Sequence, residues 1–478
     1  MVMSRCRRRL SSPRCRPAKA ATTAIRKTRS APRRRAKADR AMCDAAAPLT
    51  AHPPASASMP FEVYVHVPFC IRRCGYCDFN TYTALDLGEG ASRANYATLA
   101  IREMRVVHEW QLAHGVVEPP ASTVFFGGGT PTLLPAGDLV AMLDAVREIW
   151  GIREDAEITT EANPDSVDPG YLRLLRDGGF TRISFGMQSS VPHVLRTLDR
   201  THNPSNVAAD VEAAHRLGLE TSVDLIYGAP GESIEDWCDS VRSAIDLGVH
   251  HISAYALTVE PHTKMGRRIA AGEIEAPDDD DEATKYELAD QLLSAAGLEW
   301  YEISNWARPG HESRHNLGYW RNVDWAGIGP GAHSHYNAVR RMDMGIGHDP
   351  KAGIPVGANG QGYPARDTWT SMRAWDIPHP RVWAVALQHN RVPWQDFELI
   401  DCDENAEELL MLGVRLREGL NVSAFAERTG MKIPSTAIDT LVNEGLLTRS
   451  DDALIATLRG RLLNDLVIER LMDAAFHH

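Results

Sequence analysis

The sequence predicts an α/β protein with a partial (β/α)6 barrel, followed by a C-terminal, mainly helical, winged-helix-like domain. Two observations carry this prediction. Short apolar or β-branched runs alternate with helix-like stretches over residues 61–255, which is typical of repeated βα units and a parallel sheet. From about residue 403 the chain has three helical stretches and then a short hairpin. A doubly wound open sheet is the alternative arrangement of the same βα units.

Six predicted strands each run into glycine or polar residues where the strand ends. The strands begin near Phe61, Ser122, Ala156, Thr181, Glu220 and His250, and the helix-like stretches lie at roughly 93–113, 136–149, 168–177, 204–217 and 233–247. The residues that follow the strands are Cys70, Gly127 to Gly129, Glu161, Gln188, Asp224 and Tyr255. Because ligands gather at the carboxyl ends of parallel strands, we expect the functional site there.

The chain divides into four predicted segments of different composition. Residues 1–58 are basic and poor in large apolar side chains, so we expect them to be disordered. Residues 59–300 form the barrel core, and residues 301–402 complete it with a histidine- and aromatic-rich segment and a Gly/Pro-rich loop at 343–368. Residues 403–478 form the winged-helix-like domain, which lacks a basic recognition helix and is better suited to packing or partner binding than to DNA.

The charge is distributed unevenly along the chain. The net charge is −12, yet residues 1–58 hold 15 Lys and Arg against 2 acidic residues, which leaves 36 basic and 61 acidic residues, a balance of −25, for the rest. An acidic folded part argues against nucleic acid as the main partner. No apolar run is long enough for a transmembrane segment.

The basic N-terminal segment has three interpretations. A translation start at Met59 rather than Met1 is one, because Met59 directly precedes the first predicted strand. A transit peptide is another, since the segment is rich in Arg and Ser and poor in acids. A nucleic-acid or membrane tether is the third. The cysteines form no regularly spaced secreted framework, so we expect a reducing compartment, the cytoplasm, with the mitochondrial matrix as the alternative.

Three cysteines lie within eight residues, in Cys70-Ile-Arg-Arg-Cys74-Gly-Tyr-Cys77. A 4Fe-4S cluster takes four ligands, so three thiolates leave one iron open for another ligand. A structural zinc held by the three cysteines and nearby His66 is the alternative, although such sites usually use two separated ligand pairs. The spacing therefore favours an open, reactive iron–sulfur cluster.

The residues after the other strands suit a charged ligand. Glycines at 127–129 permit close backbone approach, although a tight turn would also use them. Glu161 and Asp224 follow the third and fifth strands, where each could also be an ordinary polar cap. Gln188 and Arg200 flank the next helix, and Arg200 could bind a carboxylate through two parallel bonds, with an exposed surface arginine as the plain alternative.

Five motifs together resemble the radical S-adenosylmethionine superfamily, specifically its coproporphyrinogen III oxidase-like branch. They are Tyr64-Val-His-Val-Pro-Phe-Cys70, the cysteine triplet, Gly127-Gly-Gly-Thr-Pro131, Ser184-Phe-Gly-Met-Gln188 and Asp224-Leu-Ile-Tyr-Gly-Ala-Pro230. The resemblance implies a 4Fe-4S cluster on Cys70, Cys74 and Cys77. It also implies S-adenosylmethionine (SAM), as one molecule or two, against Tyr64, Tyr76, Gly128, Gly129, Thr130, Glu161, Gln188, Arg200 and Asp224.

Two further marks resemble heme chaperones of the HemW type. The oxidases carry another cysteine two residues after the third, where this chain has Phe79. The second mark is His315-Asn-Leu-Gly-Tyr319-Trp320. The resemblance implies heme as cargo and heme-acceptor proteins as partners. Coproporphyrinogen III oxidase, and a radical enzyme acting on another tetrapyrrole, stay open as alternatives.

The histidines near the second mark are candidates for heme contact. His311, His315, His333 and His335 lie within 25 residues, and a neutral imidazole is a common axial ligand of heme iron. We predict that His315, Tyr319 and Trp320 contact heme, although loop histidines are mostly hydrogen-bonded or solvated. The acidic folded part would repel heme propionates, so we also expect a local basic patch, with Arg72, Arg73 and Arg314 as candidates.

Overall fold

The computed structural model describes residues 59–337 and 369–476, so the predictions for residues 1–58 and for the loop at 343–368 lie outside the described residues. The main sheet has twelve strands in the order β12-β11-β10-β9-β1-β2-β3-β4-β5-β6-β8-β7. Its central strands are β1 (Phe61–Val67), β2 (Ala121–Gly128), β3 (Ile152–Ala162), β4 (Arg182–Gln188), β5 (Glu220–Tyr227) and β6 (His251–Ala256).

These six strands are parallel and follow one another in chain order. Right-handed crossovers to the next strand place every connecting helix on the same face of a sheet. The strand order does not reverse among these six, so this part of the sheet lacks the switch point of a doubly wound fold. The predicted partial barrel is confirmed.

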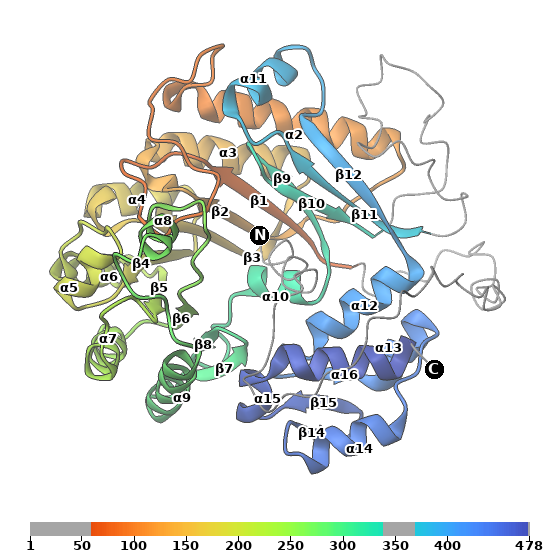
Figure 1. The fold of residues 1–478 in the computed structure, drawn as a ribbon. Coiled ribbons are helices and arrows are strands. Elements are labelled where there is room, and N and C mark those ends of the chain that lie inside the picture. The colour runs from red at the N-terminus through yellow and green to blue at the C-terminus, as the bar shows by residue number, and fades with distance from the viewer. Residues whose placement is uncertain (1–58, 338–368, 477–478) are drawn as a thin grey trace. The chain divides into compact units, whose positions relative to one another are not determined.

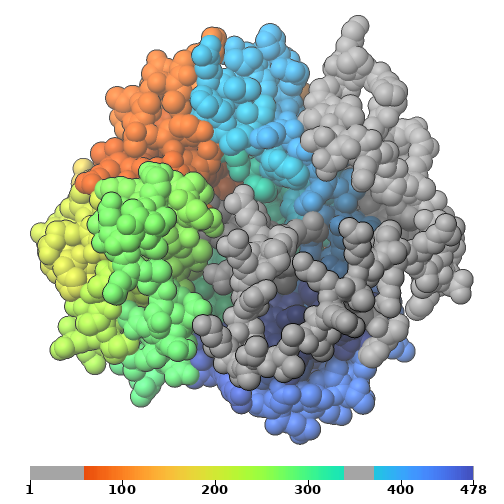
Figure 2. All heavy atoms as spheres, viewed as in Figure 1, coloured from red at the N-terminus to blue at the C-terminus, as the bar shows by residue number. Residues whose placement is uncertain are grey.

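The connecting helices lie along the outer face of the curved sheet (Figure 1). They are α2 (Tyr96–Ala113), α3 (Ala136–Ile149), α4 (Pro169–Asp177), α5 (Pro192–Thr197), α6 (Pro204–Arg216) and α7 (Ile234–Asp246). Two further helices, α8 (Lys264–Ala270) and α9 (Asp279–Ala295), follow β6, and α8 lies against the loop after β1 (Figure 2), where Met265 N–H bonds the Gly75 carbonyl at 2.8 Å. Several begin at capping side chains. Asp168 accepts a bond from the Tyr171 backbone N–H at 2.8 Å, and Ser233 accepts one from Asp236 at 3.1 Å, which satisfies N–H groups that a helix leaves free.

The six central strands bury apolar side chains outward and polar side chains inward. Val63, Val65, Phe126, Phe185 and Val223 belong to the core beneath the helices. Successive residues of a strand face opposite sides, so the alternate positions line the inside of the barrel. They include Glu62, Tyr64, His66, Thr123, Glu157, Glu161, Arg182, Ser184, Ser222, Asp224, His251 and Ser253. The barrel interior is therefore polar.

The chain beyond residue 296 extends both edges of the sheet. The elements are β7 (Glu299–Glu302), β8 (Asn305–Ala307), α10 (Arg314–Trp320), β9 (Asp324–Ile328), β10 (His333–Tyr336), β11 (Trp369–Asp376), α11 (Pro380–Gln388) and β12 (Trp394–Asp401). β9 runs parallel to β1, whereas β8 pairs antiparallel with β6 and β10 antiparallel with β9. The histidine- and aromatic-rich segment thus adds strands to both edges of the sheet, beside β1 and beside β6.

The C-terminal region is mainly helical, as predicted. It contains α12 (Cys402–Gly413), β13 (Leu420–Asn421), α13 (Val422–Thr429), α14 (Ser435–Asn443), β14 (Leu447–Ser450), β15 (Ala453–Ala456), α15 (Leu458–Leu462) and α16 (Asn464–Phe476). Arg461 joins it to the barrel, bonding the Asp290 carboxylate at 2.8 and 2.9 Å and covering the Trp300 ring at 4.3 Å. The predicted domain boundary near residue 403 stays a prediction.

Candidate functional site

The three clustered cysteines lie in the loop that follows β1, at the carboxyl end of the parallel strands. Backbone bonds close this loop at its base, from Cys70 N–H to the Tyr82 carbonyl (3.0 Å) and from Tyr82 N–H to the Pro68 carbonyl (2.7 Å). Cys77 N–H donates to the Cys74 carbonyl at 3.2 Å, and both residues line the same cavity. All three thiols are free and half-buried. The loop holds them without a disulfide.

Ionising the thiols of Cys70 and Cys77 is unfavourable in the protein alone. Burial and the neighbouring Cys77 raise the pKa of Cys70 to about 11, and burial also raises the pKa of Cys77. Thiolates that repel one another in a partly dry loop need a positive centre among them. Iron in a cluster supplies such a centre and binds the deprotonated form. The donor set therefore fits the cluster that the spacing predicts.

His66 does not lie free beside the cysteines. Its Nε2 bonds the Asn80 carbonyl at 3.0 Å, and its Nδ1 is 3.0 Å from the Tyr64 hydroxyl. A carbonyl accepts, so Nε2 carries the proton and Nδ1 accepts from Tyr64. With both nitrogens engaged, His66 has no lone pair for a metal. The zinc alternative is left without its fourth ligand.

The Asn80 side chain ties the cysteine loop to two distant segments of the chain. It donates to the Pro330 carbonyl at 2.8 Å and to the Pro378 carbonyl at 2.7 Å. Phe79, which takes the place of the oxidases' extra cysteine, lies next to it, and Arg73 donates to the Phe79 carbonyl at 3.2 Å. The loop is thus fixed by segments about 250 and 300 residues further along the chain.

The glycine-rich turn after β2 packs tightly against the start of the cysteine loop. Gly128 has a φ of 109°, and a Cβ there would come within 2.5 Å of the His66 ring. A Cβ on Gly129 would come within 2.5 Å of the Phe69 carbonyl oxygen. Thr130 N–H donates to the same oxygen at 2.8 Å, and its Oγ1 lies 4.0 Å from the Cys70 Sγ. Both positions therefore require glycine, because the His66 ring and the Phe69 backbone leave no room for a Cβ.

Two partly buried carboxyl groups share the barrel interior beside this turn. Glu161 accepts a bond from the Gly128 backbone N–H at 3.0 Å, and burial together with Asp224 raises its pKa to about 8. Burial also raises the pKa of Asp224 to about 6, although Ser184 donates to it at 3.2 Å. A cationic ligand would favour the ionised form of both groups. The pair therefore fits a ligand that carries ammonium and sulfonium groups, as SAM does.

Arg200 and Gln188 connect the cysteine loop with the end of β4. Arg200 donates to the Gly186 carbonyl at 2.8 Å and approaches the Cys74 Sγ at 3.9 Å, while its buried Nε has no partner. A buried N–H group without a partner can donate to an acceptor atom of a bound ligand. Gln188 has a φ of 62°, which is uncommon for a residue with a side chain and marks local strain. Tyr76 is partly buried beside Cys74, and its desolvation raises its pKa.

The short helix α10 lies at the end of the barrel where β1 and β2 begin (Figure 1). Glu157 accepts the backbone N–H groups of Arg314 and His315 at 3.0 and 3.2 Å, which anchors the positive end of the helix on β3. His315 is 2% exposed. Its Nδ1 lies 2.6 Å from the Thr123 hydroxyl and its Nε2 3.0 Å from the Tyr319 hydroxyl. Of the three predicted heme contacts on this helix, His315 and Tyr319 therefore belong to the barrel interior.

Aromatic rings pack around His315. We call α10, together with the side chains that pack against it, the barrel floor. The His315 ring stacks on Phe125 at 5.0 Å between centroids and lies 6.4 Å from Tyr64, a predicted SAM contact. Gly318 allows the helix to approach β1, because a Cβ there would meet the Glu62 carboxylate at about 2.0 Å. The floor thus joins the second sequence mark to the first of the SAM motifs.

The remaining predicted heme residues do not gather at this floor. Trp320 packs under the Arg415 guanidinium, 5.7 Å from the ring centroid, toward the C-terminal region. His335 is fully buried and bonds the Val323 carbonyl at 3.0 Å, and His333 stacks on Trp375 at 6.1 Å. His311 lies elsewhere and bonds Glu220 at 3.1 Å. The structure brings His315 and Tyr319 together and separates the others from them.

Sequence reasoning missed the residues that hold α10. Glu62, Thr123 and Glu157 come from three different strands, and each is polar at a position where the strand also carries buried apolar neighbours. Their only signal is the period of two, with polar residues recurring at Glu62, Tyr64 and His66. Such a period usually marks a solvent-facing side of a sheet, and here it marks the barrel interior.

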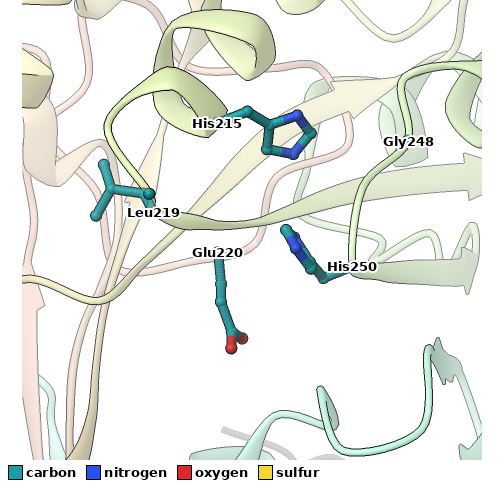
Figure 3. Close-up of a pocket in the computed structure, with 6 residues that line it drawn as sticks. His215, Leu219, Glu220, Gly248 and His250 are labelled. Carbon is teal, nitrogen blue, oxygen red and sulfur yellow. The ribbon is translucent and has the colours of Figure 1, made fainter.

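A cavity of about 340 Å³ lies at the amino ends of β5 and β6, the opposite end of these strands from the candidate site (Figure 3). His215, Glu220 and His250 line it, and His311 lies beside it, 4.8 Å from the His250 ring. Thr221 N–H donates to the His250 Nδ1 at 3.1 Å, so that nitrogen cannot bind a metal. In barrels of this kind the amino ends of the strands serve stability. We assign no ligand to this cavity.

Two family models match the chain. Residues 64–244 match the radical SAM superfamily, and residues 400–463 match the HemN C-terminal domain. The solved structure of coproporphyrinogen III oxidase (HemN) from Escherichia coli superposes with a TM-score of 0.68, at 19% identity, over 86% of this chain and 90% of that chain. The partial barrel and the cysteine loop therefore define a protein of the radical SAM superfamily with the HemN fold.

Curated relatives narrow this class. The heme chaperone HemW of Mycobacterium tuberculosis (strain CDC 1551 / Oshkosh) is 43% identical over 417 residues, 86% of this chain and 95% of that protein. HemW of Bacillus subtilis (strain 168) is 31% identical over 84% of this chain and 97% of that protein. The chain belongs to the HemW family. Within the described residues, no helix is long and apolar enough to cross a membrane.

Proposed function

We propose that this protein is a heme chaperone, which binds heme and transfers it to acceptor proteins. The observation that carries the proposal is the 43% identity to a heme chaperone along 95% of that relative's length. Phe79 and the His315–Trp320 mark, which separate this chain from the oxidases in the sequence, support it as well. A cytoplasmic location, with the mitochondrial matrix as the alternative, suits an oxygen-sensitive cluster.

The proposal includes a 4Fe-4S cluster on Cys70, Cys74 and Cys77 and exchangeable SAM at the open iron. When bound, these groups supply a one-electron cleavage of SAM that yields a 5'-deoxyadenosyl radical. The protein's own part is to bind and orient. The SAM contacts that we propose are Tyr64, Tyr76, Gly128, Gly129, Thr130, Glu161, Gln188, Arg200 and Asp224, which the site's buried acids and orphaned arginine donor support.

For heme, we propose contact with His315 and Tyr319 at the barrel floor. Heme would enter from the carboxyl ends of the strands, since α10 occupies the other end. His315 would have to exchange its bond to Tyr319 for the iron, because Nδ1 is engaged by Thr123. Trp320 would act indirectly, by fixing the end of α10 against Arg415.

Replacing His315 tests this contact. Because His315→Ala removes a buried ring and leaves Thr123 and Tyr319 unpaired, we expect the free energy of unfolding to fall by about 2–4 kcal/mol. We also expect a changed visible spectrum and weaker binding of hemin. The matched variant Tyr319→Phe removes only the hydroxyl that occupies Nε2, so it should bind hemin as well as wild type or more tightly. An unchanged hemin spectrum and affinity in folded His315→Ala would remove His315 from the heme site.

An oxygen-independent coproporphyrinogen III oxidase is the second candidate, because its fold is the one that this chain shares. An anaerobic turnover assay separates the two functions. Cluster-reconstituted protein receives coproporphyrinogen III, SAM and dithionite, and the tetrapyrroles are then separated by chromatography. We expect no protoporphyrinogen from protein that demonstrably holds its cluster and SAM, and stoichiometric binding of hemin by the same preparation. Product formed over many turnovers would make the protein an oxidase.

A further inference from the structure

The carboxyl group of Glu62 is buried beside the proposed heme contact His315. Glu62 is 2% exposed, and its Oε2 lies 3.5 Å from the His315 Nδ1 without accepting a hydrogen bond. Among the residues that the structure describes, no Lys or Arg forms an ion pair with it, since Arg314 and Arg321 pair with other carboxylates. Burying a carboxyl group without a cationic partner is unfavourable, so stability alone gives no reason for a glutamate here.

The strand register places Thr123 between this carboxyl group and the imidazole. Glu62 on β1 is the direct partner of Thr123 on β2, so their side chains stand next to each other on the inner face of the barrel. The Thr123 hydroxyl donates to the Glu62 carboxyl group, and its oxygen lies 2.6 Å from the His315 Nδ1. Because a hydroxyl carries a single hydrogen, its oxygen must accept the Nδ1 hydrogen of His315. The three side chains therefore form a hydrogen-bond relay, which we call the Glu62 relay.

The Glu62 relay fixes both the tautomer and the orientation of the imidazole. With its hydrogen on Nδ1, His315 keeps a lone pair on Nε2, which accepts from the Tyr319 hydroxyl at 3.0 Å. Stacking on Phe125, at 5.0 Å between centroids, fixes the plane of the ring. A histidine that binds a metal commonly donates its other N–H to such an acceptor, which raises the basicity of the ligating nitrogen. The relay therefore has the arrangement that supports an iron ligand at Nε2.

We propose that Glu62 and Thr123 are positioning residues, which make His315 a stronger donor to heme iron and give the barrel floor a preference for ferric over ferrous heme. The inference rests on the proposed heme contact of His315 and adds the oxidation state of the cargo. Ferric iron carries one more positive charge than ferrous iron, so it gains more from a strongly donating ligand.

Binding at the floor is a ligand exchange in which no electron is transferred. The His315 Nε2 gives up its hydrogen bond from Tyr319 and donates its lone pair to the iron, while the Nδ1 hydrogen stays on the bond to Thr123. The relay therefore remains intact in the heme complex. Its effect should appear as a difference between the affinities for the two oxidation states, and not as a loss of heme binding alone.

The test measures the midpoint potential of heme bound to cluster-reconstituted, full-length protein at one fixed pH. Hemin is added, dithionite reduces it stepwise, and the Soret band reports the oxidation state against the same protein without hemin. Affinities for hemin and for dithionite-reduced heme are measured separately. Glu62→Gln keeps the size of the side chain but removes the carboxyl group. We expect it to weaken ferric heme binding about tenfold and ferrous heme binding little, which raises the midpoint potential by about 59 mV.

Two substitutions of Thr123 and one elsewhere complete the set. Thr123→Val keeps the shape of the side chain without the hydroxyl, so it should raise the potential in the same direction. Thr123→Ser retains the hydroxyl and should restore the wild-type potential. Asp210→Asn is the control for losing a buried carboxyl group, because Asp210 is 8% exposed on α6, outside the barrel interior. It should leave the potential and both affinities at the wild-type values.

His315→Ala in the same titration separates this inference from the proposed function. If His315→Ala binds hemin with the spectrum and affinity of wild type, the proposed heme contact itself fails. If His315→Ala changes both but Glu62→Gln keeps the wild-type potential, the heme contact stands and the Glu62 relay inference fails. Equal weakening of ferric and ferrous heme in Glu62→Gln would assign Glu62 to the packing of the floor and would also overturn the proposal.

Discussion

Replacing Cys70, Cys74 and Cys77 together by alanine is expected to abolish iron and sulfide binding while leaving the protein folded. The thiols are free and half-buried, and the base of their loop is closed by backbone bonds rather than by the side chains. Removing them therefore takes away the ligands and little packing. Iron, acid-labile sulfide and zinc are measured per chain after anaerobic reconstitution, and circular dichroism reports the fold.

Single replacements separate a cluster from an unspecific metal site. Each variant retains two of three thiolates, and a cluster with only two protein ligands should be lost or strongly destabilised. Cys238→Ala is the matched control, because Cys238 is buried in α7 among the outer helices and should leave the iron content at the wild-type value. Wild-type iron content in the triple variant would show that the cluster sits elsewhere. Zinc in place of iron would revive the alternative reading of the cysteine spacing.

Binding of SAM should disappear together with the cluster. In the proposed cluster, the open iron is a ligand position that only the assembled cluster would provide, so the triple variant should lose most of its affinity for SAM even though Glu161, Asp224 and Arg200 are intact. Equilibrium dialysis of SAM against reconstituted wild type and the triple variant measures this. Equal affinity in both would mean that SAM is held by the barrel residues alone.

The parallel strands could be predicted from the sequence because each carries buried apolar residues and ends at glycine or polar residues. Five of the six begin within one residue of the predicted position, while β3 begins at Ile152 rather than near Ala156. The extra residues, Arg153 to Asp155, are charged and exposed, so they carry no apolar signal. The antiparallel strands β10 to β12 were not predicted, since their partners are set by pairing across distant segments.

In the candidate site, too, local motifs could be predicted from the sequence and contacts between distant segments could not. The cysteine triplet and the strand ends could be recognised because one short stretch of sequence carries each motif. The barrel floor could not, because His315 meets residues from β1, β2 and β3 that no local pattern connects. Helix geometry explains why only part of the His315–Trp320 mark converges. Residues four apart, such as His315 and Tyr319, share a face, whereas Trp320, next to Tyr319, lies about 100° away around the helix.

Glu161→Gln should have opposite effects on the stability of the ligand-free protein and on its affinity for SAM. In the folded state the pKa of Glu161 is about 8, against 4.5 for an unperturbed glutamate. A raised pKa of an acid means that folding disfavours the carboxylate, and that this cost grows as the pH rises from 4.5 to about 8. Glutamine avoids the charge and its amide oxygen can still accept from Gly128. At pH 8 we expect the variant to be more stable by about 4 kcal/mol.

The gain should shrink as the pH falls, because the wild-type carboxyl group then becomes protonated in the folded state and its cost disappears. Urea unfolding at pH 5 and pH 8 tests this sign. A variant that is less stable than wild type at pH 8 would mean that the carboxylate already has a favourable partner in the ligand-free protein. The expected pH dependence, taken with the loss of SAM affinity, ties Glu161 to a binding role, since a carboxylate that destabilises the ligand-free protein is stabilised by a cationic ligand.

Affinity for SAM should move the other way. Removing a buried negative charge leaves the cationic groups of the ligand without a partner, so we expect at least tenfold weaker binding, which corresponds to about 1.4 kcal/mol or more. Glu62→Gln is the matched control, because Glu62 is also buried, with a pKa raised by burial, but it lies at the barrel floor against Gly318. It should likewise stabilise the empty protein at high pH and leave SAM affinity unchanged. Equal losses in both variants would point to a general effect of interior charge rather than to contact between Glu161 and SAM.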